Sequence, residues 1–204
     1  MSPNTTITSY NTTAQEYAEK TKDFTMEQET SEFLPLIQKG GLILDIGCGP
    51  GRDAKRFTKK GYDVIGIDPS TEMINVAKRE APLAIFQNAY AENLPFKNKT
   101  FDGIWACASL IHLPKQNLPT ALVEAYRVLK PNTAFYLDFK QGSGEKLIED
   151  KRYGNVKKFF SYYQESEIER MLKSTGFSKL KTWEKGINNP YATNTWMKFL
   201  AKKN

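Results

Sequence analysis

Apolar runs alternate with amphipathic stretches along the chain from residue 42 onward. Five short apolar runs predict strands over 42–46, 63–67, 83–87, 102–107 and 133–139. The stretches between them predict helices over 52–60, 71–80 and 116–129, and in the last of these Leu118, Leu122 and Ala125 fall on one helix face. Strands that alternate with helices build a parallel sheet. The pattern therefore predicts an α/β fold.

The two ends of the chain depart from this alternation. A helix over 165–174, ended by Gly176, precedes strands over 177–183 and 194–201, and the Asn188-Asn189-Pro190 loop between those strands leaves no room for a crossover helix. The last two strands should therefore be antiparallel. Ahead of the sheet, Thr13-x-x-Glu16 and Thr25-x-x-Gln28 have the form of capping boxes and predict the starts of two helices.

A glycine turn follows the first predicted strand, in Asp45-Ile46-Gly47-Cys48-Gly49-Pro50-Gly51. Glycine lets the backbone turn tightly and approach a ligand closely. Asp45 and the helix that starts near Arg52 offer a carboxylate and a positive helix end at one place, which suits a zwitterionic amino-acid group. The dinucleotide frame G-x-G-x-x-G does not fit, because its sixth position is Arg52.

Asp68 ends the second predicted strand, 21 positions after Gly47. An acidic side chain there can accept hydrogen bonds from ribose hydroxyls. The alternative role is that of a helix N-cap, with Pro69 next to it. The first role predicts that the ligand contains a nucleoside.

These motifs, with Leu94-Pro95-Phe96, Phe101-Asp102 and Leu129-Lys130-Pro131, resemble those of the class I S-adenosylmethionine-dependent methyltransferases. The likeness runs from about residue 40 to the C-terminus and is nearest to small bacterial methyltransferase-domain proteins related to the ubiquinone and menaquinone biosynthesis enzymes. It implies a Rossmann-like, seven-stranded and mostly parallel sheet, with an antiparallel last strand and helices on both faces.

The resemblance also implies roles for residues. Asp45 and the turn would hold the methionine part of the cofactor, Asp68 the ribose, and Ala91 and Glu92 would flank the adenine. Ala108 and His112 would face the methionine end and the substrate, and Tyr17 on the first helix would close over the cofactor. The complete set expected to bind the cofactor is Tyr17, Asp45, Gly47, Cys48, Gly49, Gly51, Arg52, Asp68, Pro69, Met73, Ala91, Glu92 and Ala108.

Two positions depart from the family pattern. Tyr90 stands where relatives usually carry the Asp that binds the adenine amino group, so that group needs another partner. Asn132-Thr133 replaces the usual Gly-Gly, but asparagine tolerates a left-handed turn.

His112 is the only histidine and the candidate catalytic residue, as a general base or a substrate contact, with a structural role as the alternative. Asp138 and Lys140 are further candidates for lining the acceptor pocket. Two aromatic groups should cover the glycine turn, unless they serve only packing: Tyr10 with Tyr17, and a later group of Tyr153, Phe159, Phe160, Tyr162 and Tyr163.

Length and composition bear on the number of domains and on the cellular location. At 204 residues the chain suits one domain over 1–204, with 1–40 as a helical cover and 140–163 as a substrate-side insertion. Cys48 and Cys107 form neither a disulfide framework nor a zinc motif, no metal site is expected, and the N-terminus lacks a signal peptide, so we expect a cytoplasmic protein. No stretch is long enough to cross a membrane.

The net charge of +6 comes from dispersed lysines, and the fourth strand lacks the Asn/Asp-Pro-Pro-Tyr motif of nucleic-acid base methylation, so a nucleic-acid partner is not expected. The hypothesis is methyl transfer from S-adenosylmethionine to an oxygen, nitrogen or carbon of a small molecule. A non-catalytic cofactor-binding protein and an NAD(P)-dependent oxidoreductase are the alternatives. No motif specifies the acceptor or the oligomeric state.

Overall fold

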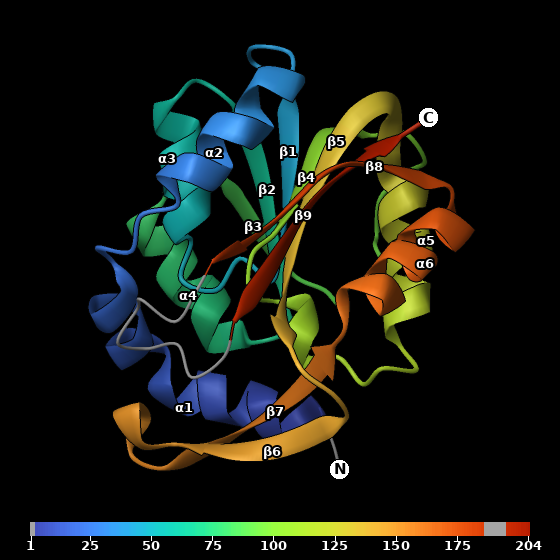
Figure 1. Cartoon of the computed structure of the whole chain (residues 1–204). Helices are drawn as coiled ribbons and strands as arrows, with labels where there is room; N and C mark the ends of the chain where they lie inside the picture. The colour runs from blue at the N-terminus through green and yellow to red at the C-terminus, as the bar shows by residue number, and fades with distance from the viewer. Residues whose placement is uncertain (1–2, 186–194) are drawn as a thin grey trace.

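The structure is a computed structural model that describes residues 3–185 and 195–204 (Figure 1). The predicted Asn188-Asn189-Pro190 loop lies outside these residues. Among the described helices, none combines the length and the apolar character needed to cross a membrane.

Seven strands form the central sheet in the order β3-β2-β1-β4-β5-β9-β8. Strands β1 to β5 are mutually parallel, and β9 is antiparallel to both β5 and β8. This arrangement confirms the predicted fold class and the antiparallel last strand. The strands are β1 (Leu42–Ile46), β2 (Asp63–Asp68), β3 (Ile85–Asn88), β4 (Phe101–Ala106), β5 (Leu129–Gln141), β8 (Phe177–Lys185) and β9 (Trp196–Lys203).

Helices cover both faces of the sheet, as Figure 1 shows. On one face α2 (Glu27–Phe33), α3 (Arg52–Lys59) and α4 (Thr71–Glu80) pack around Phe33, Phe57 and Trp105. On the other face α5 (Leu118–Val128) and α6 (Glu165–Thr175) pack on a second apolar cluster that includes Leu122 and Phe135. Burial of these apolar faces against the sheet is what holds the helices in place.

The insertion at 140–163 forms a β-hairpin that the pattern of apolar residues does not predict. Strand β6 (Glu145–Asp150) pairs antiparallel with β7 (Val156–Tyr163), and β7 pairs with the end of β5 through Lys140 and Gln141. All of β6 except Asp150 is exposed, so it carries no buried apolar alternation. Three short 3₁₀ helices complete the described elements: η1 (Leu34–Leu36), η2 (Leu110–His112) and η3 (Lys151–Tyr153).

Neither predicted capping box forms near the N-terminus, although both helices exist. Helix α1 runs over Pro3–Thr21, so Thr13 lies inside it and donates a hydrogen bond of 2.8 Å to the Ser9 carbonyl. Helix α2 begins at Glu27 after Met26, which makes no side-chain cap. Contacts with the rest of the fold, rather than local capping, set these boundaries.

Helix α1 lies along the β6–β7 hairpin at one end of the sheet (Figure 1). It also packs on α4, through Ala14 and Ala18 against Met73 and Val76. The helix and the hairpin together therefore cover the end of the sheet where the parallel strands finish. Helix α1 belongs to the 1–40 segment and the hairpin to the 140–163 segment, and their roles as cover and substrate-side insertion stay predictions.

Candidate active site

A cavity of about 470 Å³ opens at the carboxyl ends of β1, β2, β4 and β5, beneath α1 and the hairpin. Carboxyl ends of parallel strands are where α/β folds bind ligands. The cavity lining includes these residues of the predicted site: Tyr17, Asp45, Gly47, Cys48, Gly49, Arg52, Asp68, Pro69, Met73, Ala91, Glu92, Ala108 and His112. The structure thus brings together nearly all of the predicted residues.

Gly51 is the exception, because it does not line the cavity. All three glycines of the turn have φ between 52° and 81°. A Cβ on Gly47 would meet the Ser109 side chain at 2.2 Å, and one on Gly51 would meet Ala77 of α4 at 3.1 Å, whereas Gly49 faces open space. Two of the glycines therefore permit close packing of the loop and of α3, and only Gly49 leaves room for a ligand at its Cα.

Asp45 is buried in the wall of this cavity, with 2% of its surface exposed. Its Oδ2 has no hydrogen-bond partner among the described residues. Burial, and then the nearby charge of Asp53, raise the pKa of Asp45 well above its usual range. An unpartnered buried carboxylate oxygen that lines a cavity is suited to a cationic ligand group.

Arg52 supplies positive charge close to Asp45, at the first turn of α3. Its Nε and Nη2 donate to the two carboxylate oxygens of Asp53 at 3.2 and 3.1 Å. This pairing fixes the guanidinium at the cavity wall while α3 adds its positive N-terminal end. One ligand group of each charge can therefore be held side by side.

Asp68 joins the glycine turn to the start of α4. Its Oδ2 accepts from the Gly49 amide at 3.0 Å and its Oδ1 from the Ser70 amide at 2.8 Å. The N-cap of α4 is Ser70, whose hydroxyl accepts from the Met73 amide, so Asp68 is not that cap. Burial raises the pKa of Asp68 to about 6. Each carboxylate oxygen retains a second lone pair for a ligand hydroxyl.

The part of the cavity past β3 contains a carboxylate close to Tyr90, that of Glu92. Tyr90 lines the cavity with half of its surface exposed, and its ring carries no carboxylate function. The neighbouring Glu92 accepts from the Asn117 side chain at 3.0 Å through Oε1, while its buried Oε2 has no partner among the described residues. Glu92 therefore offers an acceptor close to where the family's usual Asp is missing.

Asp138 at the end of β5 shapes the loop after β4. It accepts from the Ala108 amide at 2.6 Å and from the Tyr136 hydroxyl at 3.1 Å. Ala108 has φ 52°, a conformation that L-residues rarely adopt, so this bond helps to hold a strained turn at the cavity wall. Burial raises the pKa of the adjoining Cys107 thiol well above its usual range, which keeps the thiol protonated.

His112 is bonded on both ring nitrogens. Nδ1 lies 2.7 Å from the Phe159 carbonyl oxygen, which can only accept, so Nδ1 carries the proton. Nε2 lies 3.0 Å from the Tyr10 hydroxyl oxygen and accepts a hydrogen bond from that hydroxyl. Burial lowers the pKa of His112 to about 4, so the ring is neutral. Its basic nitrogen therefore faces Tyr10.

Tyr10 belongs to a group of cavity residues that the sequence did not single out as polar contacts. The Tyr10, Tyr17 and Tyr153 rings surround the ammonium of Lys158 at 4.4, 5.2 and 4.4 Å, and this ammonium is 3.1 Å from Asp150. Of the predicted aromatic cover, Phe160 also lines the cavity, whereas Phe159, Tyr162 and Tyr163 do not.

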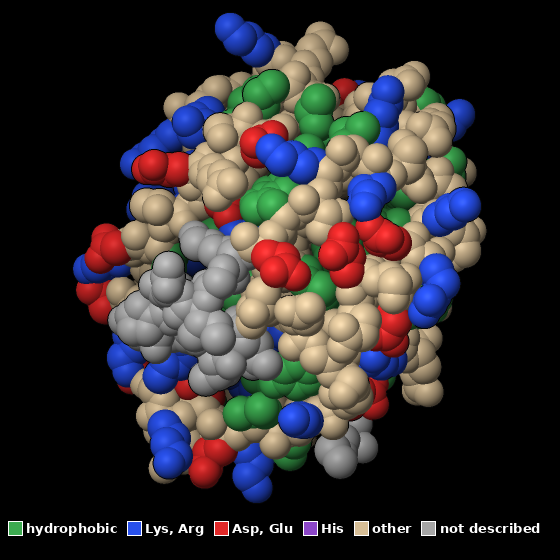
Figure 2. All heavy atoms as spheres, viewed as in Figure 1, with side chains coloured by type: hydrophobic (Ala, Val, Ile, Leu, Met, Phe, Trp, Pro, Cys, Tyr) green, Lys and Arg blue, Asp and Glu red, His purple; other side chains and the backbone are tan. Residues whose placement is uncertain are grey.

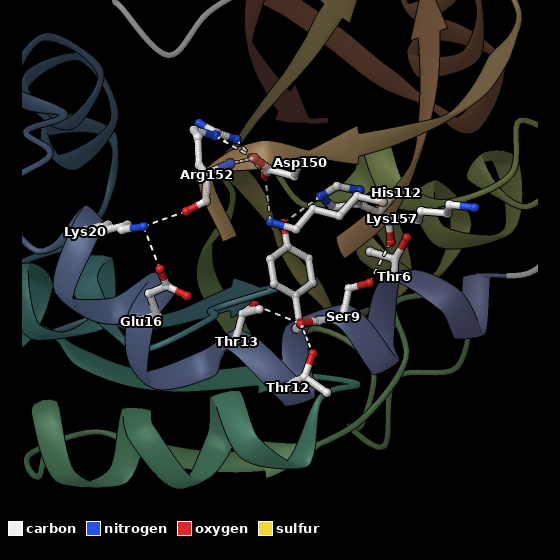
Figure 3. Close-up of polar contacts among 12 residues, drawn as sticks. Thr6, Ser9, Thr12, Thr13, Glu16, Lys20, His112, Asp150, Arg152 and Lys157 are labelled. Carbon is white, nitrogen blue, oxygen red and sulfur yellow. Dashed lines mark hydrogen bonds and ion pairs between the residues drawn. The ribbon is translucent and has the colours of Figure 1, made fainter. Parts of the chain in front are cut away.

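Hydrogen bonds fasten α1 to the hairpin along this side of the cavity (Figure 3). Thr6 accepts from the Phe159 amide at 2.8 Å, Ser9 donates to the Lys157 carbonyl at 2.6 Å, and Lys20 donates to the Arg152 carbonyl at 2.5 Å. These partners are more than 130 residues apart along the chain. Only the folded arrangement could reveal them.

Comparisons with known proteins agree with this geometry. A family profile described as "Methyltransferase domain" matches residues 43–132. An uncharacterized protein of Methanocaldococcus jannaschii, MJ1252, is 33% identical over 75% of this chain and 68% of its own length. A solved structure of a SAM-dependent methyltransferase from Methanosarcina mazei matches with a TM-score of 0.77 and 25% identity, over 89% of this chain and 98% of that chain. The chain belongs to the class I S-adenosylmethionine-dependent methyltransferases.

Two further methyltransferases show the breadth of the likeness. The ubiquinone/menaquinone biosynthesis C-methyltransferase UbiE of Rickettsia prowazekii is 35% identical over 59% of this chain, which spans half of that enzyme's length. The 1,6-didemethyltoxoflavin-N1-methyltransferase of Burkholderia thailandensis shares the fold, with a TM-score of 0.78 and 18% identity over 100% of this chain and 91% of that chain. Its structure holds 1,6-didemethyltoxoflavin and S-adenosylhomocysteine.

The cavity of this methyltransferase fits S-adenosylmethionine, the cofactor of the family. The cofactor has an ammonium, a carboxylate, ribose hydroxyls and an adenine amino group. The cavity offers an unpartnered Asp45 oxygen, Arg52 at a helix N-terminus, the acceptor pairs of Asp68 and an unpartnered Glu92 oxygen. Each of these four kinds of group thus has a counterpart on this chain.

Proposed function

We propose that this methyltransferase acts on a small molecule, which binds in the half of the cavity formed by α1, β5, β7 and β9. The observation that carries the proposal is the unpartnered, buried Oδ2 of Asp45 beside the glycine turn. Leaving such an oxygen without a partner costs free energy in the protein alone, of about 1–3 kcal/mol or more for a charged group. An ammonium group of the cofactor removes that cost.

Residues at the end of β1 would hold the methionine part of the cofactor, and residues at the ends of β2 and β3 would hold its nucleoside part. Asp45 binds the ammonium, and Arg52 with the α3 N-terminus binds the carboxylate. Asp68 accepts from the ribose hydroxyls, and Glu92 takes the place of the missing Asp in accepting from the adenine amino group. The Tyr17 ring, in edge contact with Tyr10 at 5.4 Å between centroids, closes the cavity from α1.

Bound S-adenosylmethionine supplies an activated methyl group, and the protein's task is to place the acceptor in line with it. An acceptor hydroxyl or amine that must lose a proton can donate to the Tyr10 oxygen, while Tyr10 donates to His112 Nε2 at 3.0 Å. The acceptor proton can pass to the Tyr10 oxygen as the Tyr10 proton passes to His112 Nε2, which then releases it to water, so His112 acts on the acceptor through Tyr10. It is a positioning residue in this proposal, whereas the sequence left open a general base, a substrate contact or a structural role.

A small acceptor is favoured because the acceptor half lies under α1 and the hairpin. A polymer would have to displace one of these elements. On the face shown in Figure 2, lysine and arginine side chains are spread out and interleaved with acidic ones. This distribution lacks the basic stripe that nucleic-acid binding uses.

Isothermal titration with S-adenosylmethionine and S-adenosylhomocysteine tests the proposed site. Wild-type protein should bind both, and Asp45→Asn should weaken the Kd of both by tenfold or more, because an amide cannot pair with the ammonium charge. Asp63→Asn, an exposed change at the start of β2, is the matched control and should leave both Kd values unchanged.

Absence of binding to the wild-type protein contradicts the proposed site. Turnover of a labelled methyl group onto a small-molecule extract then separates an enzyme from a cofactor-binding protein. Tight cofactor binding with no labelled product would favour the non-catalytic alternative.

A further inference from the structure

Lys140 differs from the other lysines around the acceptor half of the cavity. It lies at the end of β5, two residues after Asp138, and lines the cavity. Its ammonium lies 4.0 Å from the centroid of the Phe160 ring and 5.6 Å from that of Trp196. Among the described residues it has no carboxylate partner. Lys158, in contrast, pairs with Asp150, and Lys198 pairs with Glu29.

The charges around Lys140 leave this part of the cavity positive. Asp150 is the carboxylate whose charge acts on Lys140, but Lys158 and Arg152 already bind its oxygens at 3.1 and 2.8 Å. Burial, and then the charge of Arg152, lower the pKa of Lys140 to about 8. A partly buried ammonium that is held only by aromatic faces gains most from an anion that it can reach.

The position of Lys140 links this charge to methyl transfer. Asp138 on the same strand holds the Ala108 amide, which lies beside the methionine end of the cofactor site. Where β5 pairs with β9, Lys140 lies opposite Trp196. Where β5 pairs with β7, Lys140 lies opposite Tyr162. Lys140 thus stands on the acceptor side of the cavity, among aromatic side chains and away from Arg52, the cation beside Asp45.

We propose that the methyl acceptor is an aromatic or similarly flat apolar acid, whose single carboxylate binds the Lys140 ammonium while its ring packs against Phe160 and Trp196. This inference rests on the proposed function, because it assigns the acceptor of the same cavity. One ammonium between two ring faces matches a singly charged, flat anion. A phosphate would need several converging N–H donors, and among the described residues the other cations of this half, Arg152, Lys158 and Lys198, are already paired with Asp150 or Glu29.

Titration of protein saturated with S-adenosylhomocysteine tests the inference. The probes are benzoate, 4-hydroxybenzoate and 3-phenylpropanoate, each compared with its neutral amide. Wild-type protein should bind at least one acid about tenfold or more tightly than the matching amide. Lys140→Met should remove that preference, whereas Lys140→Arg, which keeps the charge, should retain it.

Lys146→Met is the matched control. Lys146 also lies over a ring, that of Tyr162 at 5.6 Å, but it is exposed on β6 and does not line the cavity. This variant should behave as wild type. Equal affinity for acid and amide in all three pairs, or no binding of any acid, overturns the inference. So does a Lys140→Met protein that loses affinity for S-adenosylhomocysteine, because Lys140 would then serve the cofactor. If S-adenosylhomocysteine fails to bind wild-type protein, the proposed function itself is contradicted.

Discussion

Asp45 and Asp68 are carboxylates that the fold buries with few compensating charges. Both have a raised pKa, that of Asp68 being about 6. In the proposed site the cofactor ammonium and ribose hydroxyls bind the ionised carboxylates, so bound cofactor would stabilise the deprotonated forms. The contribution of Asp68 to cofactor affinity should therefore be full above pH 7 and fall as the pH drops through 6, and the raised pKa of Asp45 shifts its contribution in the same direction. Binding near pH 6 should release protons, which titrations in two buffers of different ionisation enthalpy measure.

The same residues allow a matched pair of variants. Asp68→Asn should weaken S-adenosylhomocysteine binding at pH 7.5 by about 1.5–3 kcal/mol, the value of a hydrogen bond to a charged group, and should reduce the loss of affinity below pH 6. Asp63→Asn should match wild type at every pH. A Kd for Asp68→Asn that equals the wild-type value would remove Asp68 from the ribose site.

Tyr10 and His112 act as a bonded pair in this account. Because the pKa of His112 is lowered to about 4, its ring stays neutral throughout the neutral range. The pH profile of turnover should therefore show no rise near 6.5, the ordinary histidine value. Tyr10→Phe should lower turnover about 100-fold for an acceptor that must lose a proton, while the Kd for S-adenosylhomocysteine changes by less than twofold.

Tyr162→Phe provides the comparison, because Tyr162 lies on β7 but does not line the cavity. It should leave turnover unchanged. Wild-type turnover by Tyr10→Phe would show that the Tyr10–His112 bond serves only the fold.

At the scale of elements, both hydrogen bonds to the hairpin and apolar contacts with α4 hold α1 over the cavity. Ser9→Ala removes the bond to the Lys157 carbonyl and should weaken the docking of α1 by about 0.5–1.5 kcal/mol. Amide hydrogen exchange in α1 should then accelerate, and S-adenosylhomocysteine should dissociate faster. Thr12→Ala is the control, because exposed Thr12 bonds only within α1. Equal exchange in wild type and Ser9→Ala would contradict this role of the bond.

The elements that sequence reasoning predicts well are those that bury a periodic apolar face. Strands β1 and β2 and helices α3 and α4 lie within a residue or two of the predicted ranges. Asn132 also has the expected left-handed conformation, with φ 64°. The β6–β7 hairpin and the extent of α1 escape prediction, because β6 is exposed and the threonines of α1 are fixed by partners across the fold.

For the molecule as a whole, the two halves of the cavity differ in how far the sequence predicts them. The cofactor half lies on β1 to β4 and their loops, where local motifs such as the glycine turn point to Asp45 and Asp68. The acceptor half forms only where α1, β5, β7 and β9 meet. Tyr10, Lys158 and Lys198 carry no local motif, so their presence there depends on the tertiary fold.

The most direct measurement is a crystal structure of this methyltransferase with S-adenosylhomocysteine. The account predicts the ligand ammonium within hydrogen-bond distance of Asp45 Oδ2, the ribose hydroxyls on Asp68, and the adenine amino group on Glu92. The sulfur should face the half of the cavity that contains Tyr10 and Lys140. A ligand bound elsewhere, or one that contacts neither Asp45 nor Asp68, would contradict the account.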